Sequence, residues 1–194
     1  MITKRPAVFV DRDGTLIHEA HYLCDPARVR VFAGAARAVR LLRDAGFRVI
    51  LITNQSGVAR GFFTEADVRR VNRRVVELLR RDGARIDGVF FCPHHPEGSV
   101  GRYRKTCPCR KPRPGMVKKA ARLHSLDLKR SFVLGDHLGD MGLVRSAGLA
   151  GGVFLTTGHG KREWVKVVRT GLKVPRAGNI TRAARIILRA AGKA

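Results

Sequence analysis

The chain has 194 residues, 44% of them hydrophobic, which suits one globular α/β domain. No apolar run approaches the roughly 20 residues that span a bilayer, and the N-terminus lacks the apolar core of a signal peptide, so we expect a cytoplasmic protein without a membrane partner. Its 39 lysines and arginines against 15 acids give a formal charge of +24, which favours an anionic ligand: a phosphorylated small molecule first, nucleic acid second.

Short apolar runs alternate along the chain with longer amphipathic stretches. The expected strands are 8–10, 49–52, 89–91, 132–134 and 153–155, and the expected helices are 35–45, 65–81, 115–124 and 140–147. Because strands and helices alternate, we expect a doubly wound parallel sheet with helices on both faces. The basic C-terminal stretch still spaces apolar residues over 180–191 as a docked amphipathic helix does. We therefore expect residues 1–194 to form a single, monomeric domain.

Two carboxylates follow the first expected strand. Asp11 and Asp13 leave its carboxyl end with side chains on the same side, where open α/β sheets bind ligands. A divalent cation, typically Mg²⁺, relieves the repulsion between charges so close together. A surface turn also favours Asp and Gly, so this segment by itself supports a turn and a metal site equally.

Two other strand ends carry polar groups at the same expected edge. After the second strand come four donors that suit a phosphoryl oxygen, although a plain turn explains them equally well: Thr53, Asn54, Gln55 and Ser56. Asp136 follows the fourth strand and is a candidate third metal ligand. For Asp140 the sequence leaves two roles open, a helix N-terminal acid or indirect support of the site.

A long irregular interval separates the third strand from the next helix. It holds three of the four cysteines, and in a cytosolic chain such clustering indicates metal binding rather than disulfides. Arg110 and Lys111 end this interval just before a helix that starts near Pro114, so their charges could point toward a bound phosphate. Two adjacent cations in so basic a chain are more often exposed to solvent than part of a site. Only their position before the helix makes Arg110 and Lys111 better candidates than other basic pairs.

Four segments, in the same order and over nearly the whole chain, together resemble the haloacid dehalogenase superfamily of phosphatases. They are Asp11-x-Asp13-Gly14-Thr15, Thr53-Asn54-Gln55, Lys111 and Gly135-Asp136-x-x-x-Asp140. The resemblance implies a Rossmann-like fold with no large cap domain. It also implies that Asp11 is the nucleophile that forms an aspartyl-phosphate and that Asp13 is the general acid and base.

The same resemblance implies ligands for the cofactor and the substrate. Mg²⁺ would be held by Asp11, the backbone carbonyl of Asp13, and Asp136. Thr53 and Lys111 would hold the transferred phosphoryl group. The residues implied in substrate recognition are Asn54, Gln55, Ser56 and Arg110.

The interval at about 92–111 resembles one branch of this superfamily. Three thiolates and one imidazole, from Cys92, His94, Cys107 and Cys109, can close a tetrahedral and therefore structural Zn²⁺ site. His95 is the competing ligand; we favour His94 because its spacing from Cys92 mirrors that of the second cysteine pair.

That branch acts on heptose bisphosphates and histidinol phosphate, so we expect removal of the 7-phosphate of a heptose 1,7-bisphosphate, with histidinol phosphate second. A nucleic-acid 3′-phosphatase, which shares the first two motifs, and a zinc-stabilised binding module without catalysis are the rivals. Two departures leave the sugar open: His137 stands where the heptose enzymes usually carry Lys, and the loop Glu19-Ala20-His21-Tyr22 is less acidic than theirs. Both are expected to face the substrate.

Overall fold

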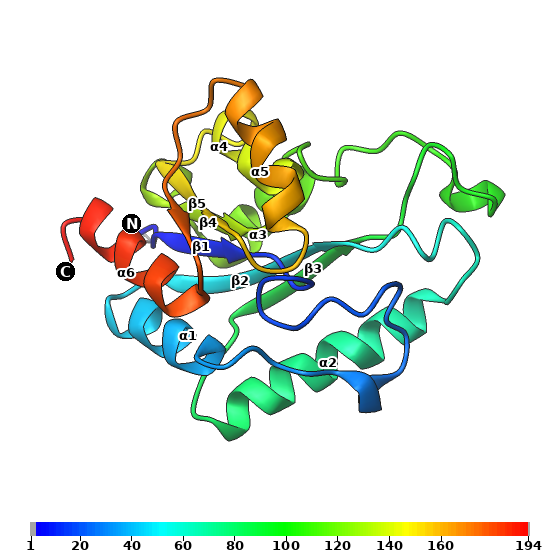
Figure 1. Ribbon diagram of the computed structural model, residues 1–194, viewed down its shortest axis with the longest axis horizontal. Coiled ribbons are helices and arrows are strands. Elements are labelled where there is room, and N and C mark those ends of the chain that lie inside the picture. Colours follow the sequence, from blue (N-terminus) through cyan, green and yellow to red (C-terminus); the bar gives the residue numbers. More distant parts are fainter. Residues whose placement is uncertain (1–2, 194) are drawn as a thin grey trace.

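A computed structural model describes residues 3–193 of the protein (Figure 1). The strands are β1 (Ala7–Val10), β2 (Arg48–Asn54), β3 (Gly88–Cys92), β4 (Phe132–Gly135), β5 (Gly151–Leu155) and β6 (Arg176–Ala177). The helices are α1 (Ala35–Asp44), α2 (Glu65–Arg81), α3 (Gly115–His124), α4 (Leu138–Ser146), α5 (Gly160–Arg169) and α6 (Ile180–Ala190). Single turns of 3-10 helix occur at Pro26–Arg28, Gly101–Tyr103 and Leu128–Arg130.

The six strands form one parallel sheet in the order β3-β2-β1-β4-β5-β6. Val8 of β1 is in register with Val49 of β2 on one side and with Phe132 of β4 on the other. The chain therefore builds outward from β1 in both directions, and the strand order reverses between β1 and β4. Open α/β sheets bind ligands at such a reversal, outside the carboxyl ends of the strands.

Helices cover both faces of the sheet, as predicted, with α1, α2 and α6 on one face and α3, α4 and α5 on the other (Figure 1). Alternate residues of β1 face opposite ways: Val8 and Val10 pack in the first core, and Ala7 and Phe9 in the second. This burial on both sides explains why the strands are apolar throughout rather than alternating.

Local signals fixed two helix starts. Thr64 and Asp67 form a reciprocal capping box at the start of α2, each side chain accepting the other's backbone N–H. α4 begins at Leu138, two residues before the predicted start, because the Nδ1 atom of His137 accepts the Gly139 N–H at 3.1 Å and caps the helix. Both caps satisfy backbone donors that have no partner within the helix.

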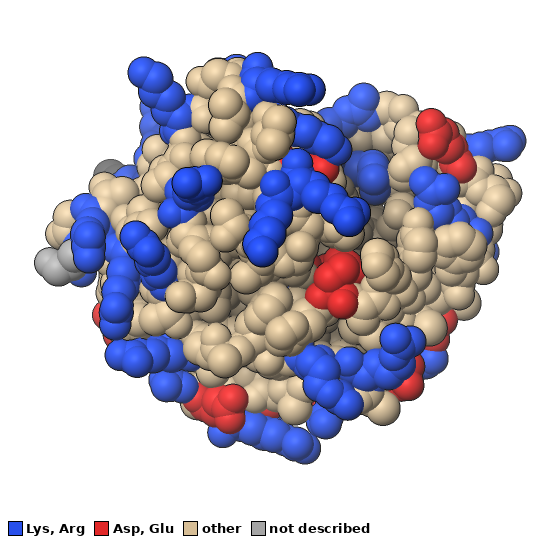
Figure 2. All heavy atoms as spheres, viewed as in Figure 1, with Lys and Arg blue, Asp and Glu red and all other residues tan. Residues whose placement is uncertain are grey.

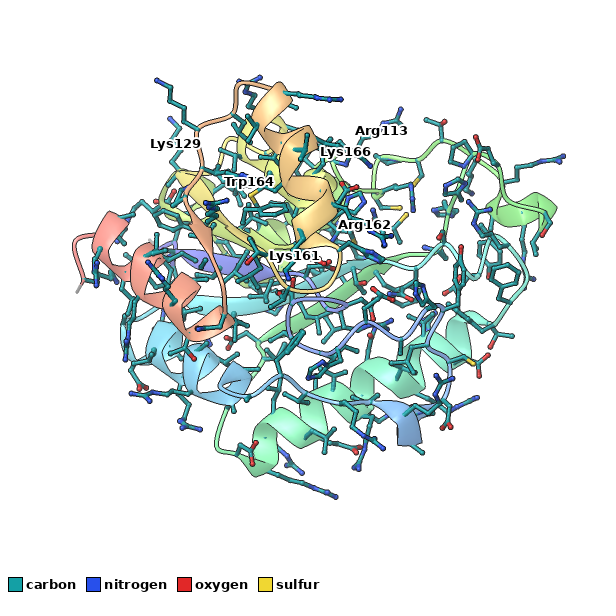
Figure 3. The ribbon with its side chains drawn as sticks, in the orientation of Figure 1. Arg113, Lys129, Lys161, Arg162, Trp164 and Lys166 are labelled. Atoms are coloured by element: carbon teal, nitrogen blue, oxygen red, sulfur yellow. The ribbon has the colours of Figure 1, made fainter. Side chains whose placement is uncertain are left out.

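The C-terminal third holds one confirmed helix and two elements that were not predicted. α6 buries Ile180, Ala183 and Ile187, which confirms the docked helix. In contrast, α5 and β6 lie in a stretch whose many basic residues hide the apolar pattern. In α5, Trp164 turns inward and its ring lies 5.2 Å from that of Phe154 (Figure 3). No helix within residues 3–193 is long and apolar enough to span a bilayer.

The interval between β3 and α3 is irregular, as expected, and projects from the sheet edge (Figure 1). It rests on the loop that follows β2: the Val100 N–H donates to the Ala59 carbonyl at 2.9 Å. A Cβ on Gly98 would lie only 2.7 Å from the same oxygen, so the two loops touch backbone to backbone. The insert is therefore held against the edge of the sheet that carries the strand ends.

Candidate active site

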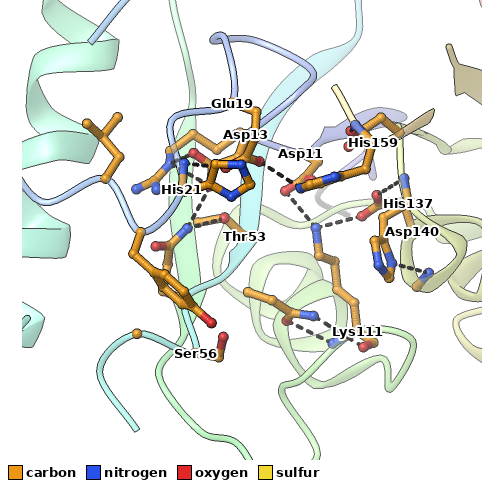
Figure 4. A pocket seen from close by; sticks show the side chains of 18 of the residues that line it. Asp11, Asp13, Glu19, His21, Thr53, Ser56, Lys111, His137, Asp140 and His159 are labelled. Carbon is orange, nitrogen blue, oxygen red and sulfur yellow. Dashed lines mark hydrogen bonds and ion pairs between the residues drawn. The ribbon is translucent and has the colours of Figure 1, made fainter. Parts of the chain in front are cut away.

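The carboxyl ends of the strands surround a pocket of about 400 Å³ (Figure 4). Fourteen residues that the sequence singled out line it: Asp11, Asp13, Glu19, His21, Tyr22, Thr53, Asn54, Gln55, Ser56, Arg110, Lys111, Asp136, His137 and Asp140. Ala20 does not line the pocket. It packs instead against the core between the sheet and α1, α2 and α6, whereas Glu19, His21 and Tyr22 line the pocket.

Lys111 is the central charge of the pocket. Its Nζ lies 2.7 Å from Asp11 Oδ1 and 2.6 Å from Asp140 Oδ1, and it donates to the Ile52 carbonyl at 3.1 Å. Burial raises the pKa of Asp11 to about 6, although Lys111 opposes that rise. Burial alone would lower the pKa of Lys111, but the two carboxylates outweigh it and raise that pKa. The lysine therefore stays charged beside a carboxylate that is ionised at neutral pH.

Asp140 fills both of the roles that the sequence left open. One carboxylate oxygen accepts the His137 N–H at 3.1 Å and so caps α4. The other faces Lys111, and the side chain is fully buried. The acid at the helix start thus also orients the lysine of the site.

Asp136 lies opposite Asp11 across the strand reversal. Its Oδ2 accepts the His159 N–H at 2.8 Å, and burial, with Asp11 and Asp140, raises its pKa to about 8. Gly14 adopts φ 72° and lets the Asp136 carboxylate lie against the backbone, because a Cβ on residue 14 would lie only 2.1 Å from Asp136 Oδ2. Oxygens of Asp11, Asp136 and Asp140 all lie within 4.8 Å of one another. Three buried carboxylates around one lysine fit a divalent cation with hard oxygen ligands such as Mg²⁺.

Asp13 is held by a buried arginine. Arg12 Nε donates to both oxygens of Asp13 at 3.1 Å, and its Nη1 donates to Asn72 Oδ1 at 2.9 Å. Gln55 Nε2 donates to Asp13 Oδ2 and to Thr53 Oγ1, both at 2.8 Å. The Asp13 carboxylate is 21% exposed and faces the pocket, so it is fixed in direction yet reachable by substrate and water.

Asn54 uses its amide on the protein backbone. Its Oδ1 accepts the Lys111 N–H at 3.1 Å, and its Nδ2 donates to the Lys111 carbonyl at 3.2 Å. This residue of β2 therefore fixes the backbone from which the Lys111 side chain enters the pocket. It also lines the pocket, so the contact with the substrate that the resemblance implies stays a prediction.

The rim of the pocket carries two imidazole and carboxylate pairs. His159 Nε2 lies 3.4 Å from Glu19 Oε2 (Figure 4). His137 Nε2 lies 3.4 Å from Oε2 of Glu163, a residue of α5 that does not itself line the pocket. Burial lowers the pKa of His137, although Glu163 opposes the shift. His21 adopts φ 37°, a strained value for a residue with a side chain, and its N–H donates to Glu19 at 2.9 Å. The contact of Glu19 with His159 joins the loop at 19–22 to the loop after β5.

Four ligand atoms converge in the insert. The Sγ atoms of Cys92, Cys107 and Cys109 lie 3.0 to 3.3 Å apart, and His94 Nδ1 is 3.3 Å from Cys109 Sγ. Hydrogen bonds from Cys92, and then from Cys107 and His94, lower the pKa of Cys109 to about 5. Three thiols and one imidazole gathered in one place are the donor set of a tetrahedral Zn²⁺ site. His95 lies outside the group, and its Nδ1 accepts the Glu97 N–H.

Sequence reasoning missed three residues of the site. His159 had an available signal, because polar residues follow β5 just as they follow the other strands. Glu163 lay in the unpredicted α5. Arg12 gave no signal, since an arginine between two aspartates reads as exposed, yet it is 1% exposed here.

The fold and the site together define a hydrolase of the haloacid dehalogenase class. Residues 108–175 match the family model described as HAD-hydrolase-like. A D-glycero-beta-D-manno-heptose-1,7-bisphosphate 7-phosphatase of Rhodopseudomonas palustris is 48% identical over 148 residues, which cover 76% of this chain and 82% of that protein. A protein of the same name from Yersinia pestis is 39% identical over 153 residues, 79% of this chain and 81% of its own.

Solved structures agree with this assignment. The D,D-heptose 1,7-bisphosphate phosphatase from B. bronchiseptica, complexed with magnesium and phosphate, matches with a TM-score of 0.80 at 29% identity. The match covers 95% of this chain and 98% of that one. The chain belongs to the haloacid dehalogenase-like hydrolase family.

Proposed function

We propose that this protein is a Mg²⁺-dependent phosphatase that removes the 7-phosphate of D-glycero-D-manno-heptose 1,7-bisphosphate. The observation that carries the reaction is the placement of Asp11 2.7 Å from Lys111, with Asp13 held two residues further along. The substrate rests on the relatives named for it, which the chain matches over most of their length.

In the proposed reaction Asp11 is the nucleophile. One of its oxygens bonds to phosphorus while the bond from phosphorus to the sugar oxygen breaks, and Asp13 gives its proton to the leaving alkoxide. Asp13 then takes a proton from water, which attacks the aspartyl-phosphate and releases Asp11 and inorganic phosphate. Thr53 and Lys111 hold the phosphoryl oxygens throughout. Arg12 keeps Asp13 directed at the leaving alkoxide and then at the attacking water.

Asp11, Asp136 and the backbone carbonyl of Asp13 are the proposed ligands of Mg²⁺. The buried carboxylate cluster supports Asp11 and Asp136 as ligands, because its third member, Asp140, is paired with Lys111. When bound, the cation neutralises charge between the nucleophile and the phosphate.

Cys92, His94, Cys107 and Cys109 are the proposed ligands of a structural Zn²⁺. Four protein ligands leave no position for water, so this ion orders the insert rather than takes part in the chemistry. Residues 1–194 would then form one phosphatase domain in which the insert at about 92–111 is a short cap beside an open site. A monomeric state and a cytoplasmic location stay predictions; light scattering on the purified protein tests the first.

Phosphate release from a panel of substrates, with and without Mg²⁺, tests the proposal. The panel holds both anomers of heptose 1,7-bisphosphate, histidinol phosphate and a 3′-phosphorylated oligonucleotide. We expect the highest kcat/KM on a heptose bisphosphate and no turnover by Asp11→Asn. Preference for histidinol phosphate or the oligonucleotide would overturn the substrate, and no turnover on any phosphomonoester would overturn the activity.

The distribution of charge supports a small substrate rather than a nucleic acid. Basic side chains are spread over the visible surface and are not gathered in one groove (Figure 2).

A further inference from the structure

The turn that follows β5 is fixed to the backbone of the active site. Thr157 Oγ1 donates to the Gly14 carbonyl at 2.6 Å, and the backbone N–H of His159 donates to Asp136 Oδ2 at 2.8 Å. Between these two residues, Gly158 adopts φ 52°, and a Cβ on it would lie only 2.5 Å from Gly14 Cα. Three successive residues are therefore packed against Gly14 and Asp136, and the ring of His159 projects from a rigid base.

The loop at 19–22 differs from this turn because its backbone is strained. His21 adopts φ 37° and Tyr22 adopts φ 54°, in the left-handed region that residues with a side chain rarely occupy. Such a conformation persists only where the surrounding structure holds it. The His21 N–H donates to Glu19 Oε1 at 2.9 Å, so the conformation of the loop depends on where the Glu19 carboxylate lies.

His159 contacts this carboxylate from outside the loop. Its Nε2 lies 3.4 Å from Glu19 Oε2, while the other oxygen of Glu19 accepts the His21 N–H (Figure 4). Within residues 3–193, His159 is the one basic side chain that pairs with Glu19. Glu19, His21 and Tyr22 all line the pocket. The ring of His159 thus connects the rigid turn to the part of the rim that a substrate meets.

We propose that His159 is a positioning residue that sets the affinity for the substrate by holding the loop at 19–22 in its strained conformation. A loop that is held before the substrate arrives loses little freedom when the substrate binds. The backbone N–H that contacts Asp136 does not depend on the ring, so the ring acts on the loop alone. This inference rests on the proposed function and adds to it a residue that acts on substrate affinity rather than on the chemical step.

His159→Ala tests the role of the ring, because it removes the imidazole and keeps the backbone N–H. The side chains of His159 and Glu19 are 43% and 22% exposed, so we expect an effect of about fivefold, the upper end for an exposed pair. KM for heptose 1,7-bisphosphate should rise by that factor. We expect kcat, the Mg²⁺ concentration for half-maximal activity and the inhibition constant of inorganic phosphate to stay within about 1.5-fold. His159→Gln, which keeps an N–H donor near the place of Nε2, should restore most of the affinity.

Hydrogen exchange of the backbone amides at 19–22, followed by mass spectrometry, reports on the loop without any substrate. His159→Ala should speed this exchange about fivefold, because the acceptor of the His21 N–H is no longer held. In a Glu19→Ala background the same substitution should add nothing, because His159 acts through Glu19. Lys161→Ala is the matched control: it removes an exposed cation two residues further along and should change neither the exchange nor KM.

Unchanged exchange or an unchanged KM in folded His159→Ala would overturn the inference. A change in kcat or in the Mg²⁺ requirement as large as the change in KM would also overturn it, because the residue would then support Asp136 rather than the loop. If the wild type cleaves no heptose bisphosphate, the proposed function fails separately. KM is then measured for the phosphomonoester that the wild type cleaves best, and if it cleaves none, the exchange measurement, which needs no turnover, decides whether His159 holds the loop.

Discussion

Replacement of Arg12 by Met should damage both stability and catalysis. The guanidinium is 1% exposed and makes a bond of 2.9 Å to Asn72 as well as the contacts that fix Asp13. Removing one partner of a buried ion pair costs about 3–5 kcal/mol. Asp13 is partly exposed and regains water, so we expect the lower end, about 3 kcal/mol. For a chain of this size that lowers the thermal midpoint by about 6–12 °C.

Catalysis should fall because Asp13 loses its main support. A general acid and base contributes about 10²- to 10⁴-fold to a rate, and Gln55 still holds one oxygen of Asp13. We therefore expect kcat of Arg12→Met to fall about 100-fold, near the low end of that range. Urea unfolding gives the free energy, and phosphate release at a temperature where the variant is fully folded gives kcat.

Asn72→Leu is the matched control. It removes the contact of Arg12 with Asn72 but leaves the contacts of Arg12 with Asp13. We expect it to lose about 1–2 kcal/mol of unfolding free energy and to keep kcat within a few-fold. If Arg12→Met, fully folded, keeps the wild-type kcat, then Arg12 does not position Asp13 and the reasoning is refuted.

Three further predictions concern the metal sites and Lys111. Elemental analysis should find one zinc per chain. Cys107→Ser should lose the zinc and unfold the insert, whereas Cys24→Ser, at an exposed cysteine, should keep it. Wild-type protein that contains no zinc after purification without chelator would contradict this prediction. Asn54→Ala should lower kcat about 10-fold with KM within about twofold, because it frees the Lys111 backbone; a change in KM alone would instead indicate contact with the substrate. The pKa of Asp136 lies near 8, above its unfolded value of 3.8, so ionisation costs the metal-free protein stability as pH rises through that window. Mg²⁺ binds the ionised form, so the Mg²⁺-induced rise in thermal midpoint should be larger at pH 8.5 than at pH 6, and a rise independent of pH would contradict the assignment.

The sequence by itself determined the fold class and the edge of the sheet where the chemistry lies. Apolar runs that alternate with amphipathic helices allow little besides a parallel, doubly wound sheet, and residues that follow parallel strands must meet at one edge. Asp11 and Asp136 were therefore placed correctly from their positions after strands, and Thr53, which the structure puts near the end of β2, lies at the same edge. The insert was found by a different signal, the clustering of three cysteines within eighteen residues.

Only the tertiary structure decided what each side chain does at that edge. Arg12 is paired with Asn72, sixty residues away, and no local pattern reports such a contact. Asn54 holds the backbone of Lys111 across 57 residues, so its role depends on how the insert folds back onto β2. Local spacing fixes which edge of the sheet a residue reaches. The partner of a buried polar group is fixed instead by the packing of segments that are distant in the sequence. That packing alone decides which donors and acceptors lose water together and must bond to each other.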